Sequence, residues 1–245
     1  MKNFKYIILI ILASIPTILS AQIMQIDNWS DLPILQQISQ SNKIKLGQTY
    51  IDLSNLSNSP YLHEEFSPGQ IIDKEKKRKI KAYIRYRIID DVFEVKKSID
   101  DDELHVLQRS EKYDVLLNTD EMFTFQYNLP VLIHGSNSGY VEVLVNNDDK
   151  VSLYKRLGQT YNPGQEARSS YQKGKAPSIS TETYYMIKIG NRAYSIEPHK
   201  RKAADAFPDK NEILEDYIKD NKLKFRGDDE EKALIQLVEY YNSLN

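Results

Sequence analysis

Cysteine is absent from the 245 residues of this chain. Its absence excludes disulfide bonds, so the fold must be stabilised by an ordinary hydrophobic core. It also excludes a lipid anchor attached through a cysteine. The length fits one domain of somewhat above average size, or one β domain with a helical appendage, better than two independent units.

Histidine is scarce, and the common cofactor motifs are missing. A zinc site is usually recognised by ligands that lie close together in the sequence. The four histidines are far apart, and none belongs to an HExxH motif. His63 beside Glu64 and Glu65 comes nearest to a ligand cluster, and a solvated loop explains it more simply. No GxGxxG or P-loop motif occurs. We therefore expect no metal and no cofactor.

The chain also lacks an excess of positive charge, with 33 basic against 35 acidic residues. Removal of residues 1–21 would take away two lysines and no acidic residue, which leaves 31 basic and 35 acidic residues. A protein that binds nucleic acid usually carries a clearly basic surface. We therefore expect no nucleic-acid partner.

The N-terminal residues have the three parts of a secretory signal. Lys2 and Lys5 form a basic start, residues 6–19 an apolar core, and Ser20-Ala21 a small-residue cleavage site. The apolar core is shorter than the about 20 residues that span a bilayer, and an uncleaved anchor is the alternative. We expect residues 1–21 to be a signal peptide and the mature chain to have no transmembrane span. It would be exported and be periplasmic, associated with the outer membrane, or extracellular.

Residues 79–97 carry the clearest β pattern. Apolar side chains occupy alternate positions and charged side chains the positions between them, as in a strand with one buried face. A two-residue turn at Asp90-Asp91 would place Arg87 opposite Glu94 as an exposed ion pair. We therefore predict a β-hairpin with this register.

Further short strands are predicted throughout residues 22–197. Apolar runs are separated by turn-forming residues, and no helical pattern lies between them, so we expect antiparallel pairing. The runs are residues 43–53 (a strand pair interrupted at Gly47), 70–72, 104–107, 113–117, 122–127, 131–133, 140–145, 151–154, 183–189 and 192–196. Residues 22–40 suggest a short amphipathic helix, with Ile34, Leu35 and Ile38 on one face. Residues 159–181 have little to bury and suggest a long surface loop or the flexible boundary of the domain.

The period of the pattern changes in residues 198–245. Two apolar stripes at helical spacing predict two short antiparallel helices. Asn221 should end the first helix, and Asp228 with Glu231 should form an acidic capping box for the second. The predicted fold class is therefore α+β, mainly β. An antiparallel meander, sandwich or partly open barrel would pack against a C-terminal two-helix hairpin.

Three stretches together resemble a family of uncharacterised exported proteins of Gram-negative bacteria. They lie within residues 61–69, 85–95 and 207–242, and include Arg85-Tyr86-Arg87 and Phe207-Pro208-Asp209-Lys210. The resemblance spans most of the mature chain. It implies export and a single domain of β strands with helices, and it assigns no activity and no catalytic residue.

Tyrosine is abundant, with 17 residues. Exposed tyrosine rings can stack on sugars or peptides, although tyrosine is also common in strands for packing reasons. If a surface patch binds a ligand or partner, the candidates are Tyr83 on the outer side of the first hairpin and Tyr161 and Tyr171 in the predicted loop.

Three functions are compatible with these features. The first is an exported, non-enzymatic envelope protein that binds an envelope protein or a surface polymer, or acts as an accessory component. The second is a hydrolase of cell-surface polymers, whose carboxylates the sequence does not single out. The third is a periplasmic carrier of an apolar ligand.

The motif from Gly135 to Gly139 resembles a serine elbow, but lies between two predicted strands and is better explained as a turn.

Overall fold

The computed structural model describes residues 24–25, 35–38, 43–46, 48–118, 120–166 and 173–244. The predicted signal peptide at residues 1–21 lies outside this part of the chain, and so does Tyr171. Within it, no helix combines the length and the hydropathy that crossing a bilayer requires.

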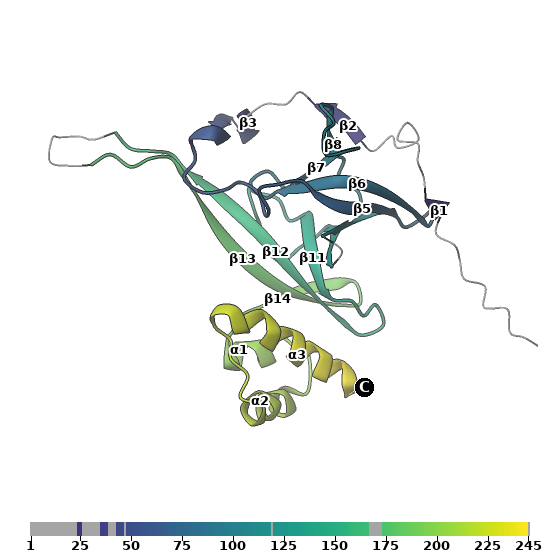
Figure 1. Cartoon of the computed structure of the whole chain (residues 1–245). Coiled ribbons are helices and arrows are strands. Elements are labelled where there is room, and N and C mark those ends of the chain that lie inside the picture. The colour runs from purple at the N-terminus through teal and green to yellow at the C-terminus, as the bar shows by residue number, and fades with distance from the viewer. Residues whose placement is uncertain are drawn as a thin grey trace, which may run out of the picture.

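Figure 1 shows one large sheet with the helices gathered on one side of its C-terminal strands. The strands of this sheet are β1 (Met24–Gln25), β2 (Leu35–Ile38), β5 (Ser67–Asp73), β6 (Arg78–Arg87), β7 (Val92–Lys96), β8 (Leu104–Leu107), β9 (Tyr113–Leu117), β10 (Glu121–Gln126), β11 (Gly139–Val145), β12 (Val151–Asn162), β13 (Ser178–Ile189) and β14 (Arg192–Ile196). A separate pair consists of β3 (Lys43–Leu46) and β4 (Thr49–Asp52). The helices are α1 (Lys200–Asp205), α2 (Asn211–Asp220) and α3 (Glu230–Ser243), with single 3-10 turns η2 (Leu53–Asn55) and η3 (Gly227–Asp229).

The order of the large sheet is β14-β13-β12-β11-β10-β9-β5-β6-β7-β8-β2, and β1 adds to β6. All neighbours in this order are antiparallel, whereas β1 runs parallel to β6. The described strands do not close into a barrel. The predicted α+β class, with a large antiparallel sheet and C-terminal helices, is thus confirmed.

The predicted hairpin forms, but its register differs by two residues. Arg85 lies opposite Glu94, and the connection is a four-residue loop from Ile88 to Asp91 instead of a two-residue turn. Ile89 explains the longer loop, because it is fully buried in a cluster with residues of β4 and β13. Since side chains alternate with period two, a shift of two residues leaves every predicted face unchanged.

Two hydrophobic clusters hold the layers together. The first, here called the sheet core, fills the inner face of β5–β11 and centres on Tyr86, Phe93, Phe123 and Tyr140, whose rings stack or meet edge to face at 4.7–6.3 Å. The second, the helix–sheet core, joins β12–β14 to the apolar stripes of α1, α2 and α3. Two hydrogen bonds also tie α3 to β12. The Asn242 side-chain amide accepts from the backbone N–H of Val151 (3.0 Å) and donates to the carbonyl of Val151 (2.8 Å).

Several local predictions were wrong for identifiable reasons. Leu35–Ile38 is a strand paired with β8 instead of a helix, because this sheet edge accepts its backbone. Residues 131–133 form no strand and make only a bridge between Ile133 and Ser136. Residues 159–162 and 178–181, predicted as loop, are the ends of β12 and β13, where backbone pairing continues and the paired Tyr161 and Ile179 pack into the cluster around Ile89.

The helical part was predicted in outline. Asn221 ends α2 as expected, and its side chain donates to the Tyr217 carbonyl at 3.0 Å. The capping box was wrong, because α3 begins after Asp229 and no side chain caps it. The six-residue α1 was not predicted, since its buried face consists only of Ala203 and Ala204.

Truncation of Phe93 tests the sheet core. This ring is fully buried against three other aromatic rings. Phe93→Ala should therefore lower the free energy of unfolding by about 3–5 kcal/mol. Urea denaturation measures the loss, with Leu132→Ala as the control because Leu132 is 67% exposed. Equal stability of the two variants would contradict the assigned core.

Candidate functional site

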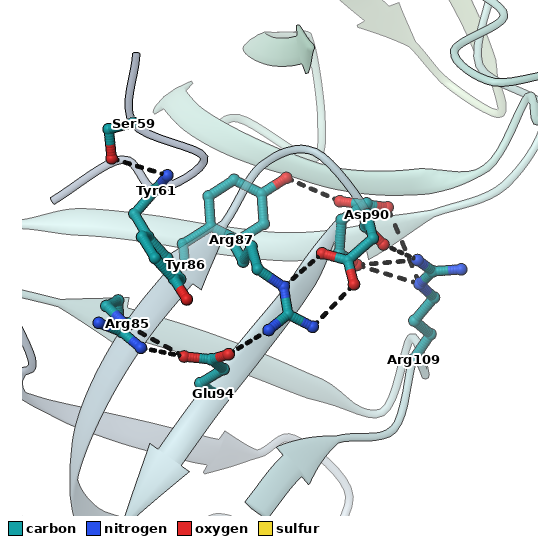
Figure 2. Close-up of polar contacts among 9 residues, drawn as sticks. Ser59, Tyr61, Arg85, Tyr86, Arg87, Asp90, Glu94 and Arg109 are labelled. Carbon is teal, nitrogen blue, oxygen red and sulfur yellow. Dashed lines mark hydrogen bonds and ion pairs between the residues drawn. The ribbon is translucent and has the colours of Figure 1, made fainter. Parts of the chain in front are cut away.

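Buried charges gather beside the β6–β7 hairpin, as Figure 2 shows. Arg87 Nε lies 2.7 Å from Asp90 Oδ1, and its guanidinium also pairs with Glu94. Arg85 Nη2 lies 2.6 Å from Glu94 Oε2, and the Tyr61 ring stacks over its guanidinium with 3.8 Å between Cζ and the ring centroid. Glu94 is only 1% exposed, so the predicted surface ion pair is interior. Because each of these charges has an opposite partner, the cluster leaves no free charged group for chemistry.

Asp91 is the most perturbed carboxyl group near this cluster. Burial raises its pKa to about 6, although the Tyr86 hydroxyl donates to Oδ1 at 2.7 Å and the Tyr140 N–H donates at 3.2 Å. Gly139 passes between this carboxylate and Arg156. A Cβ there would lie 2.8 Å from Asp91 Oδ2 and 2.6 Å from Arg156 Nη2, so a larger residue would displace one of these two side chains. The neighbours of Asp91 thus satisfy it from all sides, as expected for a structural group.

An open groove lies in the helical layer, between α1, the C-terminal half of α2 and residues 222–226. Its volume is about 750 Å³. Seven of the ten residues that line it are basic or histidine, and Glu215 is the one acidic member. The lining consists of His199, Lys200, Arg201, Glu215, Ile218, Lys219, Lys222, Lys224, Phe225 and Arg226. In a chain with more acidic than basic residues, this is a strong local concentration of positive charge.

The end of α2 builds one wall of the groove. The Leu223 N–H donates to the Ile218 carbonyl at 3.0 Å and the Lys222 N–H to the Lys219 carbonyl at 3.2 Å, which is a Schellman motif. Lys222 occupies its left-handed position with φ +53°, where glycine is usual and another residue costs about 1 kcal/mol. Leu223 is buried beneath it, so the neighbouring lysines are directed outwards.

Most cations of the groove have no anionic partner. Within the described chain, Lys200, Arg201, Lys219, Lys222 and Arg226 make no ion pair, whereas other exposed lysines do. Lys219 also lies in the last turn of α2, where a cation interacts favourably with the helix dipole. The helix dipole explains the position of Lys219 but not the positions of the other four cations.

The structure does not bring the predicted tyrosines together. Tyr83 is half-buried on β6 and lines a pocket of about 300 Å³ with Lys81 and Lys97. Tyr161 is half-buried on β12 and packs against the cluster around Ile89. Tyr171 lies outside the described residues. Ligand binding by these residues stays a prediction.

Sequence analysis missed the basic groove. The signal that could have indicated it is two basic runs, HKRK at residues 199–202 and KLKFR at residues 222–226. Each run alone is typical of a solvated surface. Only the packing of α1 against α2 brings them to one groove.

The raised pKa of Asp91 predicts that stability depends on pH. Between its ordinary value of 3.8 and the folded value of about 6, the folded state holds a proton that the unfolded state has lost. The free energy of unfolding should therefore fall as pH rises from about 4 to about 7, by on the order of 2–3 kcal/mol. Asp91→Asn keeps an acceptor oxygen, tolerates positive φ and should flatten this slope.

Urea denaturation at several pH values measures the slope of each variant. Asp149→Asn is the matched control, because Asp149 is exposed and should keep the slope of the unmodified chain. An unchanged slope in Asp91→Asn would show that this carboxyl is not the group that titrates.

Comparison with protein-family models, with curated proteins and with solved structures gives no match to this chain. Its function must therefore be inferred from its own side chains.

Proposed function

We propose that this chain is an exported, non-enzymatic binding protein of the cell envelope that holds an anionic envelope component in the basic groove. The observation that carries the proposal is the set of five basic side chains that line one groove without an anionic partner among the described residues. Like charges that face one cavity repel one another. An anionic ligand would relieve this repulsion, and the groove would thereby favour it.

The size and the apolar lining of the groove, in addition to its charge, support ligand binding. Its volume of about 750 Å³ lies in the range of small-ligand sites, roughly 300–1,000 Å³. Ile218 and Phe225 contribute apolar surface beneath the charges. Apolar walls lower the local dielectric constant, so each charge contributes more to binding there than on a flat surface.

The composition of the groove favours binding over the other two functions. Hydrolysis of a glycosidic polymer generally uses two carboxylates across a cleft, and Glu215 is the one carboxylate among the described residues that line this groove. A carrier of an apolar ligand would need a predominantly apolar cavity. The secretory features of residues 1–21 support an envelope location for the ligand.

Inositol hexakisphosphate, a compact polyanion, is a suitable probe for calorimetric titration of the mature chain. Arg201→Glu with Arg226→Glu reverses two groove charges and places no acid at the C-terminus of α2. This double variant should bind about tenfold more weakly or worse, and added salt should weaken the binding of the unmodified chain. The matched control, Lys76→Glu with Lys77→Glu, changes the same charge in the β5–β6 turn and should bind normally.

Absence of binding to the unmodified chain, or equal loss in both double variants, would refute a specific anion site. In the second case, net charge alone would account for the binding.

Export predicts a processed N-terminus. N-terminal sequencing of the protein from the envelope or culture fraction of its native cells should give Gln22 as the first residue. A chain that begins at Met1 and is recovered from the membrane would instead support the uncleaved anchor. A full-length chain in the cytoplasm would contradict export.

A further inference from the structure

A second, smaller groove adjoins the first. Its volume is about 250 Å³, and it lies between the segment after α2 and the first turns of α3. Its lining is Asn221, Lys222, Leu223, Lys224, Asp229, Lys232, Ala233 and Gln236. Lys222 and Lys224 line both grooves. Residues 222–224 therefore form a ridge with a groove on either side, here called the lysine ridge.

The lysine ridge is held in place by the fold. The Schellman motif fixes its backbone to α2, and Leu223 anchors it in the helix–sheet core. Lys222 and Lys224 extend outwards on either side of this anchor, and both are exposed. Their cationic groups are thus directed to solvent at the boundary between the grooves and can serve a ligand in either one.

The charge of the second groove has the same sign as that of the first. It contains three lysines and one acid, Asp229, whose Oδ2 lies 3.8 Å from Lys224 Nζ in an exposed and loose pair. Lys232 carries the positive charge beyond the ridge, onto α3. A compact anion in the larger groove would leave this charge unused.

We infer that the two grooves form one tract that binds a linear acidic polysaccharide across the lysine ridge. This inference rests on the proposed function and names its ligand class. Successive carboxylates or sulfates along such a chain could pair with cations of the first groove, the ridge and Lys232 in turn. Lysine suits this task, because its ammonium is a point charge on a flexible stem that accepts an anion from many directions.

The lining favours a polysaccharide over a nucleic acid. Proteins that bind single strands usually offer several aromatic rings on which successive bases stack. Phe225 and His199 are the two residues with aromatic rings that line either groove in the described chain.

Heparin-derived oligosaccharides of defined length test the tract with the full mature chain. A dodecasaccharide should bind more tightly than a disaccharide by more than the statistical gain from its extra binding positions. Lys232→Glu should weaken the dodecasaccharide several-fold and leave the disaccharide unchanged. Equal affinity of the variant and the unmodified chain for the dodecasaccharide would overturn the tract but leave anion binding in the larger groove intact. Failure of both oligosaccharides and of inositol hexakisphosphate would instead refute the proposed function.

Lys222→Gly separates binding from stability. Glycine relieves the left-handed backbone, so the variant should unfold at a higher urea concentration, yet it should bind the dodecasaccharide several-fold more weakly. Lys77→Gly is the matched control, because Lys77 also has a positive φ (+50°) but lies in the β5–β6 turn. It should gain stability and keep full affinity.

Two results would contradict the ligand assignment. Full affinity of Lys222→Gly would show that the ridge does not contact the ligand. Tighter binding of a single-stranded oligonucleotide or a polyglutamate of equal charge would assign the tract to another class of polyanion.

Discussion

β12 and β13 pair along all of their length, from Val151 opposite Ile189 to Asn162 opposite Ser178, and apolar side chains are buried on both faces of this pair. On one face the helix–sheet core fixes α1, α2 and α3. On the other, Met186 and Tyr154 pack against β11 and the loop that precedes it. Because this apolar face is the surface on which the helices pack, the pairing of these two strands determines where the basic groove lies.

Alternation predicted the buried faces of the first hairpin but not its loop. The faces follow from a period of two, which a shift of two residues preserves, whereas the register depends on the burial of Ile89 by strands distant in the sequence. The ends of β12 and β13 were missed for the opposite reason. Most of their side chains are polar, so their sequence shows no apolar alternation, and backbone pairing together with the burial of Ile179 makes them strands.

The functional features were harder to predict than the fold, because charges become a site only through tertiary contacts. Glu94 and Arg87 were expected outside, yet the segment around Tyr61 covers them. The groove includes residues of α1, a helix whose weak apolar pattern did not predict it. It also includes Lys222, which occupies a backbone position that favours glycine.

The two hydrogen bonds between Asn242 and Val151 have a consequence for biosynthesis. Residues near the C-terminus supply Leu237, Val238 and Tyr241 to the helix–sheet core and then tie α3 to the start of β12. A polypeptide emerges N-terminus first, so this core cannot form until α3 has left the ribosome or the translocation channel. Late completion would keep the nascent chain unfolded for longer, as the proposed export would require.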